Sequence, residues 1–92
     1  LPRTILEAMA LKTPIIASDV DGIPELVEDQ KSAILFSLSN IDKMNKGIYS
    51  IYSNDVFRHN ITQNASTRYW ESFSRENHIQ KYTDFVNQLP HA

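Results

Sequence analysis

Residues 1–27 read LPRTILEAMALKTPIIASDVDGIPELV, and this stretch contains the succession of elements that decides the fold. Residues 4–11 are good helix formers without glycine, and Pro14 ends that helix because a proline pushes the residue before it out of the helical region. Residues 14–17 form a short apolar, β-branched run, typical of a strand buried on both faces of a parallel sheet. Residues 18–22 are rich in turn formers, and a helix of about two turns is expected over residues 23–28.

The rest of the chain predicts one more strand and three helices. A second buried strand is expected over residues 33–36. Asn40 is a good N-cap for a helix whose apolar residues share one face: Ile41, Met44, Ile48, Ile51 and Tyr52. Residues 53–55 break and recap the chain before a helix with an apolar residue at every fourth position: Phe57, Ile61, Ala65, Tyr69 and Phe73. Ser74 is expected to cap a last helix that turns these residues inward: Ile79, Tyr82, Val86 and Leu89.

Helices that alternate with short apolar strands predict an α/β fold with parallel strands flanked by helices and a helical C-terminus. We treat residues 1–92 as one unit, with a strand-and-helix portion at 1–38 and a helical portion at 39–92. Two strands do not make a sheet that can bury both its faces. The missing strands are therefore expected from residues upstream of Leu1 or from another copy of the chain, because unpaired edges seek strands.

Length and composition restrict the class of protein. Ninety-two residues suffice for one domain with a modest core, and 41% hydrophobic and 22% charged residues are ordinary for a soluble globular protein. The absence of cysteine excludes disulfides, thiolate catalysis and cysteine-based zinc sites. No run approaches the ~18 apolar residues of a membrane span, and no signal peptide is visible. A chain that opens on leucine fits a piece of something longer, and we expect a cytoplasmic protein.

Charge is unevenly spread along the chain. Residues 1–30 carry six acidic and two basic residues, whereas residues 31–92 carry seven basic and five acidic residues. Neither half is basic enough to indicate a footprint for nucleic acid. Solvated helix faces are expected to hold the basic side chains Arg58, Arg68, Arg75 and Lys81.

Glu7 is the first candidate for a binding residue, and two interpretations of it stay open. A carboxylate has two acceptor oxygens that suit the vicinal hydroxyls of a ribose, and dinucleotide folds use an acid in this way. Thr4 and Glu7 also have the spacing of a capping box, in which Glu7 would reach back to an N–H at the helix start. N–H groups of that first turn, from Arg3 and Thr4, could face a diphosphate, although Pro2 contributes none.

Asp19 and Asp21 spell an Asp-x-Asp pattern, which in some enzymes holds a divalent metal. Two acids in a short loop arise easily by chance, and an Asx-type turn with a helix cap over Asp19 to Gly22 is the preferred interpretation. Glu25 lies in the first turn of the expected short helix, where an acid offsets the helix dipole. We expect no metal ligand and no catalytic residue in this chain.

The combination Leu6-Glu7-Ala8-Met9-Ala10 with Gly22-Ile23-Pro24-Glu25 resembles the C-terminal, donor-binding half of retaining family-4 glycosyltransferases, the group 1 type with the GT-B fold. The resemblance extends from Leu1 to about Phe36, and Phe73-Ser74 is similar to the start of the family's last helix. It implies a partial Rossmann-like domain. By position, Glu7 matches the second glutamate of the family's paired motif, which binds the donor ribose. Thr4 and the backbone of Pro2 and Arg3 match the turn that faces the diphosphate and the donor sugar.

The resemblance also implies an activity for the parent protein, a hexosyltransferase. It would transfer a sugar with retention from a nucleoside-diphosphate sugar to a hydroxyl of a glycan or lipid-linked acceptor, without a metal, in polysaccharide biosynthesis. The first glutamate, the cations on the diphosphate and the acceptor-binding domain would lie upstream of Leu1, so the chain alone is expected to be inactive. Peripheral contact of the parent with the inner face of a membrane fits such acceptors.

Three alternatives to this activity stay open. A nucleotide-sugar epimerase would use the same scaffold, but it needs an acid–base constellation that the chain does not show. A non-catalytic nucleotide-sugar binding module would keep donor affinity without turnover. An oligomerisation domain, built by pairing strands of two copies, would need Glu7 only as a cap.

Overall fold

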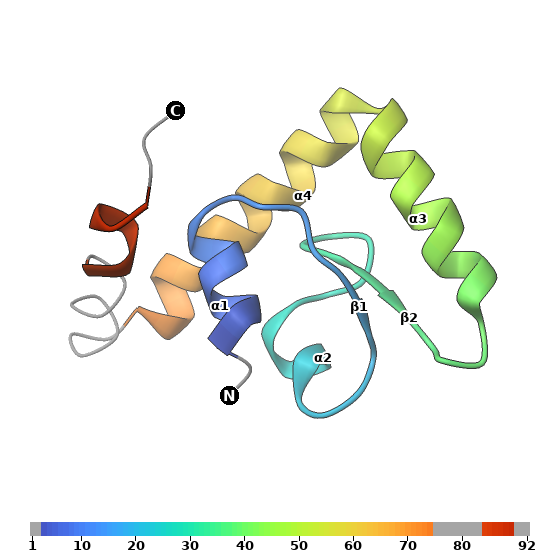
Figure 1. Cartoon of the computed structure of the whole chain (residues 1–92), viewed down its shortest axis with the longest axis horizontal. Coiled ribbons are helices and arrows are strands. Elements are labelled where there is room, and N and C mark those ends of the chain that lie inside the picture. The colour runs from blue at the N-terminus through green and yellow to red at the C-terminus, as the bar shows by residue number, and fades with distance from the viewer. Residues whose placement is uncertain (1–2, 75–83, 90–92) are drawn as a thin grey trace.

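A computed structural model describes residues 3–74 and 84–89 of the chain. The elements run in the order α1 (Arg3–Ala10), β1 (Ile16–Ser18), α2 (Ile23–Leu26), β2 (Ile34–Phe36), α3 (Ile41–Ser53) and α4 (Asp55–Arg68) (Figure 1). A π-helical segment, η1 (Tyr69–Phe73), continues α4, and its wider turn is seen in the bond from the Ser74 N–H to the Tyr69 carbonyl at 2.9 Å. The expected α/β class is confirmed.

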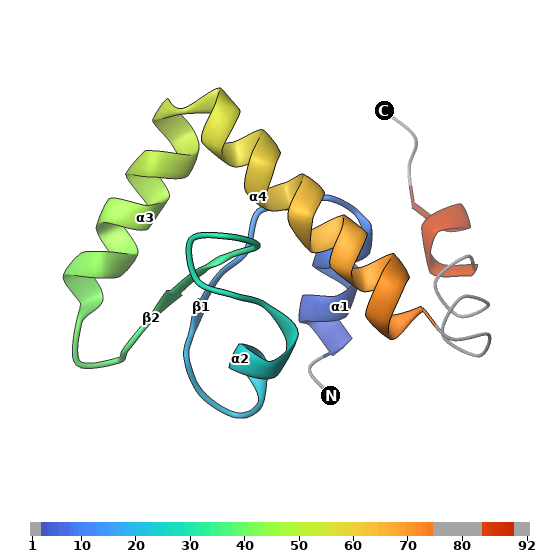
Figure 2. The ribbon, with the colours of Figure 1, turned by 180° about the vertical axis from the view of Figure 1, so that it is seen from behind.

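The two strands form a parallel sheet in which Ile16 pairs with Ile34 and Ser18 with Phe36. Helices α1 and α4 lie to one side of the strands and α3 lies to the other side (Figure 1, Figure 2). Leu35 faces the side of α1 and α4, within a core cluster that also contains Leu6, Met9, Leu26 and Tyr69. The result is a helix–sheet–helix sandwich, compatible with part of a Rossmann-like domain.

β2 is buried along its length, but β1 is not. All three residues of β2 are buried, because α3 covers one of its faces and the core cluster the other. The residues of β1 are only half-buried. The expectation of full burial is therefore wrong for β1, since no strand among the described residues lies along its second edge.

The two N-terminal helices end differently from expectation. Lys12 adopts a left-handed conformation with φ 56°, its N–H donates to the Met9 carbonyl, and the N–H of Thr13 donates to the Ala8 carbonyl at 3.0 Å. This Schellman motif ends α1, so the helix does not extend to the residue before Pro14, where the proline was expected to end it. α2 has four residues instead of two turns, because Val27 is already extended, with φ −132° and ψ 153°.

The cap expected at Asn40 is confirmed, and Asn54 supplies the cap within the expected recapping segment 53–55. The Asn40 side chain accepts from the Lys43 N–H at the start of α3, and the Asn54 side chain accepts from the Phe57 N–H at the start of α4. The apolar stripe of α4 is also confirmed, with Ile61, Ala65 and Tyr69 buried. The expected last helix falls mostly outside the described residues, of which 84–87 are helical.

The buried face of α3 is only partly the expected one. Gly47 is the buried residue of this helix, and a Cβ there would lie 2.6 Å from the Ile34 Cγ2 atom. The missing side chain lets α3 approach β2 closely. Ile41, Ile48 and Tyr52 were expected to face inward, but they are 46%, 49% and 83% exposed.

Asp29 connects α3 to the outer edge of β2, which is the edge away from β1. One carboxylate oxygen accepts from the Leu35 N–H at 2.8 Å and the other from the Lys43 ammonium at 2.5 Å. Burial opposes the ionised form of Asp29, but the bonds from Lys43 and Leu35 outweigh it, so the pKa of Asp29 lies below its ordinary value of 3.8.

This lowered pKa predicts a loss of stability in acid. A carboxyl whose pKa is lower in the folded state stabilises the fold at pH values above its unfolded pKa, and the contribution disappears as pH falls through the folded pKa. Because the side chains of Asp29 and Lys43 are about one-third exposed (35% and 37%), we expect their ion pair to contribute less than about 1 kcal/mol to the free energy of unfolding. Urea titrations between pH 6 and about 3 should show a smaller acid-dependent loss in Asp29→Asn, which keeps an acceptor for Leu35. An identical pH profile in both proteins would contradict the assignment.

Candidate functional site

The carboxyl ends of the two parallel strands meet at one end of the molecule. The start of α1, the loop after β1 and the segment leading into α3 lie at this same end, at the bottom of Figure 1. The loop is tied to the neighbouring strand by a bond from the Asp19 N–H to the Phe36 carbonyl at 3.0 Å. In open α/β sheets, ligands bind in the crevice at the carboxyl ends of the strands. This end is therefore the candidate site.

Glu7 and Arg3 stand one helical turn apart at the start of α1. The Arg3 Nε atom lies 3.5 Å from Glu7 Oε1, and the side chain of Glu7 is 26% exposed while that of Arg3 is 76% exposed. A half-buried carboxylate beside a guanidinium can accept hydrogen bonds from hydroxyl groups, while the guanidinium can bind a nearby anion.

Thr4 lies within α1, so it is not the N-cap residue of that helix. The capping-box interpretation of Thr4 and Glu7 is therefore wrong, since an N-cap residue has a non-helical conformation. Thr4 is exposed in the first turn. Pro2 lies outside the described residues, so the structure brings together only Arg3, Thr4 and Glu7 of the expected site.

The loop after β1 is a tight turn with two left-handed residues. The Ile23 N–H donates to the Val20 carbonyl at 3.1 Å, and the residues between them have φ 52° at Asp21 and φ 82° at Gly22. This is the signature of a type I′ turn, which favours an Asp-Gly pair. Gly22 is the N-cap of α2, within the range expected for the cap, but the cap has no side-chain bond, so the Asx-type part of the interpretation is wrong. Residues 3–74 and 84–89 contain no group of three His, Cys, Asp or Glu residues that could hold a metal.

Arg68 holds α2 in place from 42 residues away. Its Nε donates to the Leu26 carbonyl at 2.6 Å, and a terminal nitrogen donates to the Glu25 carbonyl at 2.9 Å. Its guanidinium also lies 5.4 Å from the centre of the Phe73 ring. Arg68 is exposed, as expected of a solvated face, but no local signal in the sequence indicates these contacts.

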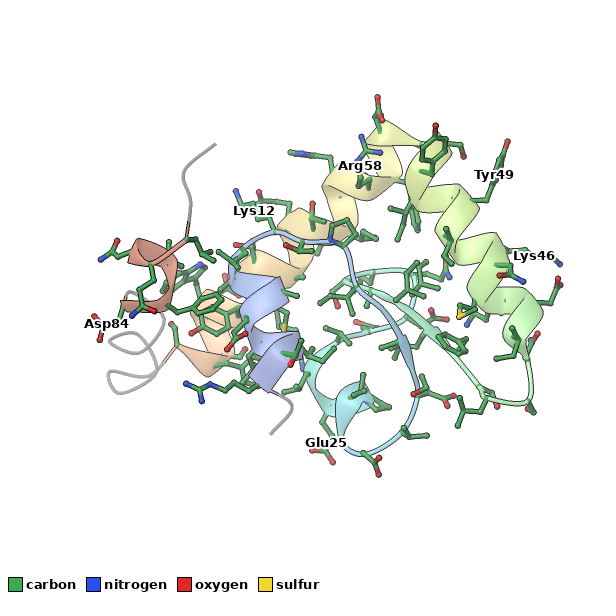
Figure 3. All side chains as sticks on the ribbon, viewed as in Figure 1. Lys12, Glu25, Lys46, Tyr49, Arg58 and Asp84 are labelled. Atoms are coloured by element: carbon green, nitrogen blue, oxygen red, sulfur yellow. The ribbon has the colours of Figure 1, made fainter. Side chains whose placement is uncertain are left out.

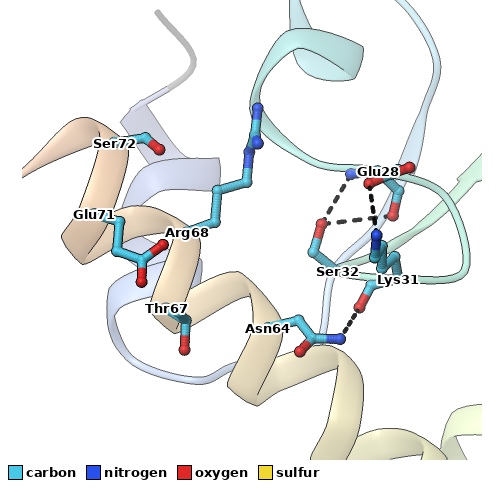
Figure 4. A pocket seen from close by; sticks show the side chains of 8 residues that line it. All are labelled: Glu28, Lys31, Ser32, Asn64, Thr67, Arg68, Glu71 and Ser72. Carbon is cyan, nitrogen blue, oxygen red and sulfur yellow. Dashed lines mark hydrogen bonds and ion pairs between the residues drawn. The ribbon is translucent and has the colours of Figure 1, made fainter.

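A polar hollow of about 260 Å³ lies between α4 and the loop after α2 (Figure 4). Asn64 donates across it to the Lys31 carbonyl at 2.8 Å, and the Lys31 ammonium lies 3.8 Å from a Glu28 carboxylate oxygen. Because these groups already satisfy one another, we assign the hollow to the packing of α4 against the loop.

A second hollow, of about 520 Å³, lies beside the C-terminal end of α1 and is lined by Lys12, Arg58 and His59 among others. Figure 3 shows Lys12 and Arg58 at the end of the molecule away from Glu25. Arg58 is itself bound to the Asp55 carboxylate and the Ile51 carbonyl, which also corrects its expected solvated role. Arg75 and Lys81 lie outside the described residues. Neither hollow is at the carboxyl ends of the strands.

Comparisons with known proteins place this geometry in a family. Residues 1–68 match the family model of glycosyl transferases group 1. The chain is 33% identical over 84 residues to an uncharacterized glycosyltransferase of Methanocaldococcus jannaschii. The aligned segment covers 91% of this chain and 21% of that protein. It is 31% identical over 86 residues to a trehalose synthase of Thermococcus litoralis and to one of Pyrococcus furiosus, covering 94% of this chain and 20% of each.

The chain thus spans about a fifth of the length of these relatives. Among the described residues, no helix has the length and apolar character needed to cross a membrane. The matched segment contains the start of α1, both strands and α4, which are the elements that build and support the candidate site. With a family model matched over most of its length, the chain belongs to the group 1 glycosyl transferases.

Proposed function

We propose that this chain is the C-terminal part of the donor-binding domain of a retaining, family-4 type glycosyltransferase with the GT-B fold. The parent enzyme is a hexosyltransferase that takes its sugar from a nucleoside-diphosphate sugar. The observation that carries this proposal is the place of Glu7: it lies in α1 one turn after Arg3, in a helix whose start is at the carboxyl end of the sheet (Figure 1), within the segment matched to the family.

The geometry around Glu7 supports a role in donor binding. Its partly exposed carboxylate suits the two vicinal hydroxyls of a ribose, and Arg3 and Thr4 lie in the first described turn of α1. Such a helix start favours a diphosphate.

In the proposed reaction, the acceptor hydroxyl attacks the donor sugar on the face that the diphosphate leaves, and the diphosphate helps to remove the proton. Glu7 positions the donor and transfers no proton. Helix-start N–H groups and cations from upstream residues stabilise the charge that develops on the diphosphate, without a metal. The chain alone is inactive in this proposal, since the first glutamate and the acceptor domain belong to the preceding polypeptide.

The acceptor in this proposal is a glycan or a lipid-linked sugar, bound by the N-terminal domain of the parent enzyme. A role in polysaccharide biosynthesis follows, in the cytoplasm and at the inner face of the membrane. A trehalose synthase among the relatives supports a sugar acceptor as the chemical class.

Glu7→Gln tests the donor-binding proposal. In the complete polypeptide that carries these residues, we expect at least tenfold weaker binding of the preferred donor, about 1.4 kcal/mol, because an amide replaces one of the two acceptor oxygens by a donor. The melting temperature should stay unchanged. Calorimetric titration with UDP-glucose, GDP-mannose and ADP-glucose, each with and without EDTA, identifies the donor and measures the loss.

Glu25→Gln is the matched control, an exposed acid in the first turn of α2 that should leave donor affinity unchanged. Equal donor affinity in wild type and Glu7→Gln would refute the role of Glu7. Donor binding without sugar transfer to any acceptor would instead identify a binding module.

A further inference from the structure

α3 exposes an apolar stripe beside its buried face. Because successive helical residues turn by about 100°, Ile41, Ile48 and Tyr52 lie within roughly 40° of one another. Met44 and Ile51, both partly buried, lie between this stripe and Gly47, which touches the sheet. Lys46 lies on the other side of the helix and points away from the strands (Figure 3). The apolar arc of α3 is therefore wider than the contact that the described residues make with it.

The direction of the stripe follows from Lys43. This residue and Ile51 fall on opposite sides of Gly47 around the helix. Lys43 binds Asp29, and Asp29 accepts from the Leu35 N–H on the outer edge of β2, away from β1. The opposite flank of α3, which carries Ile41, Ile48 and Tyr52, therefore points to the side of β1.

The sheet can grow on that side and not on the other. The outer edge of β2 is closed, because Asp29 takes the Leu35 N–H and the Gln30 N–H donates to the Ala33 carbonyl at 2.7 Å. Along β1, the bonds of Ile15 and Asp19 point toward β2, so the alternating groups of Ile16 and Ser18 point away from it. No described strand lies there.

The handedness of the connections gives the same direction. Leu6 of α1 and Leu26 of α2 both enter the core cluster on the Leu35 face of the sheet. Right-handed crossovers place successive helices on one face only when successive strands are added in one direction. A parallel strand before α1 would therefore lie beyond β1, on the side to which the α3 stripe points.

We propose that Ile41, Ile48 and Tyr52 form the contact surface for an amphipathic helix of the polypeptide that precedes Leu1. That helix lies beside α3, on the same face of a sheet extended across β1. The length of the relatives supports this occupant, since about four-fifths of each lies outside the matched part. A parallel sheet needs helices on both faces, so strands added beyond β1 require such a cover next to α3. The inference stands apart from the donor site and does not depend on Glu7.

Thiol labelling tests this contact, because the 92 residues contain no cysteine. Ile48→Cys reports the stripe and Lys46→Cys, on the other side of α3, is the matched control. In the complete polypeptide, each rate of reaction with N-ethylmaleimide is measured on the labelled peptide by mass spectrometry and divided by the rate in urea. We expect the thiol of Ile48→Cys to react at least about tenfold more slowly than the thiol of Lys46→Cys, because it becomes accessible only with local unfolding.

Each outcome decides the proposal. Equal normalised rates at the two positions would overturn it, since the stripe would then face water. Protection that disappears on dilution would assign the stripe to a second copy of the chain and would also overturn it. If Ile48→Cys does not fold, Tyr52→Cys replaces it, because the Tyr52 side chain is 83% exposed in the described part of the chain. Donor titration of the same variants separates this result from the proposal on Glu7.

Discussion

Replacement of Tyr69 by alanine should lower the free energy of unfolding by about 3–5 kcal/mol, the range for removing a large buried aromatic side chain. Tyr69 is 0% exposed and stands where α4 passes into η1. Its ring lies in the same core cluster as Leu6 and Met9 of α1. The cavity left by alanine would open between α1 and α4, where the packed core limits how far neighbouring side chains can move to fill it.

Urea unfolding followed by circular dichroism measures this loss. Trp70→Ala is the matched control: Trp70 contacts Tyr69 edge to face, at 5.0 Å between ring centres, but it is 48% exposed. We expect the control to cost about 1 kcal/mol or less. Similar losses in the two variants would show that Tyr69 is not a centre of the core.

Tyr69 also connects the core to the candidate site. It packs against the helix that carries Glu7, so a looser α1 should weaken donor binding without any change in a donor contact. This separates two classes of variant. Glu7→Gln changes affinity at constant stability, whereas Tyr69→Ala changes both.

Local rules explain which parts of the fold the sequence predicts. Asn40 and Asn54 cap helices because their side chains reach an N–H three residues on, and both partners lie in the same few residues. The stripe of Ile61, Ala65 and Tyr69 is narrow, so its buried side is unambiguous. β2 is predicted for a similar reason, since a short apolar run between polar turns is typical of a buried strand.

The errors arise where distant parts of the chain decide. The apolar arc of α3 is wide, and periodicity cannot tell which part of it meets the sheet; the close approach at Gly47 selects one flank. Burial of β1 depends on a neighbouring strand that the described residues do not supply. The left-handed Lys12 ends α1 through bonds that depend on backbone conformation, which composition does not reveal.

The candidate site likewise contains residues that the sequence predicts and residues that it does not. Glu7 could be found from its spacing and from the family resemblance, and the structure places it in α1, the helix that begins at the carboxyl end of the sheet (Figure 1). The position of Thr4 within α1 argues against the cap interpretation, and the donor-binding role of Glu7 stays a prediction. Arg68 could not be found, because its partners are carbonyl oxygens 42 and 43 residues away and any residue supplies a carbonyl.

Arg68→Met should destabilise the chain by about 1–3 kcal/mol and should loosen α2 more than the rest of the fold. Hydrogen bonds from a charged group are worth about 1.5–3 kcal/mol each, and the exposure of Arg68 reduces this. α2 has only four residues, so it has little internal bonding to hold its end once the guanidinium is gone. Methionine keeps the apolar stem, so the change removes the two donated bonds and the contact of the guanidinium with the Phe73 ring.

Arg68→Lys is the matched control, because an ammonium is a single point charge that cannot reach both carbonyls as a planar fork does. We expect an intermediate loss of stability. Hydrogen exchange distinguishes the local effect from the global one. The Val27 N–H, which donates to the Ile23 carbonyl at 3.2 Å, should exchange roughly tenfold faster in Arg68→Met. The exchange of the N–H groups of α4 near Ile61 should accelerate no more than the global loss of stability requires. A uniform acceleration across the chain would show that Arg68 supports the whole core and does not hold α2. Because α2 follows the left-handed turn at Asp21 and Gly22, the selective result would mean that the loop at the candidate site is positioned from α4, through one guanidinium.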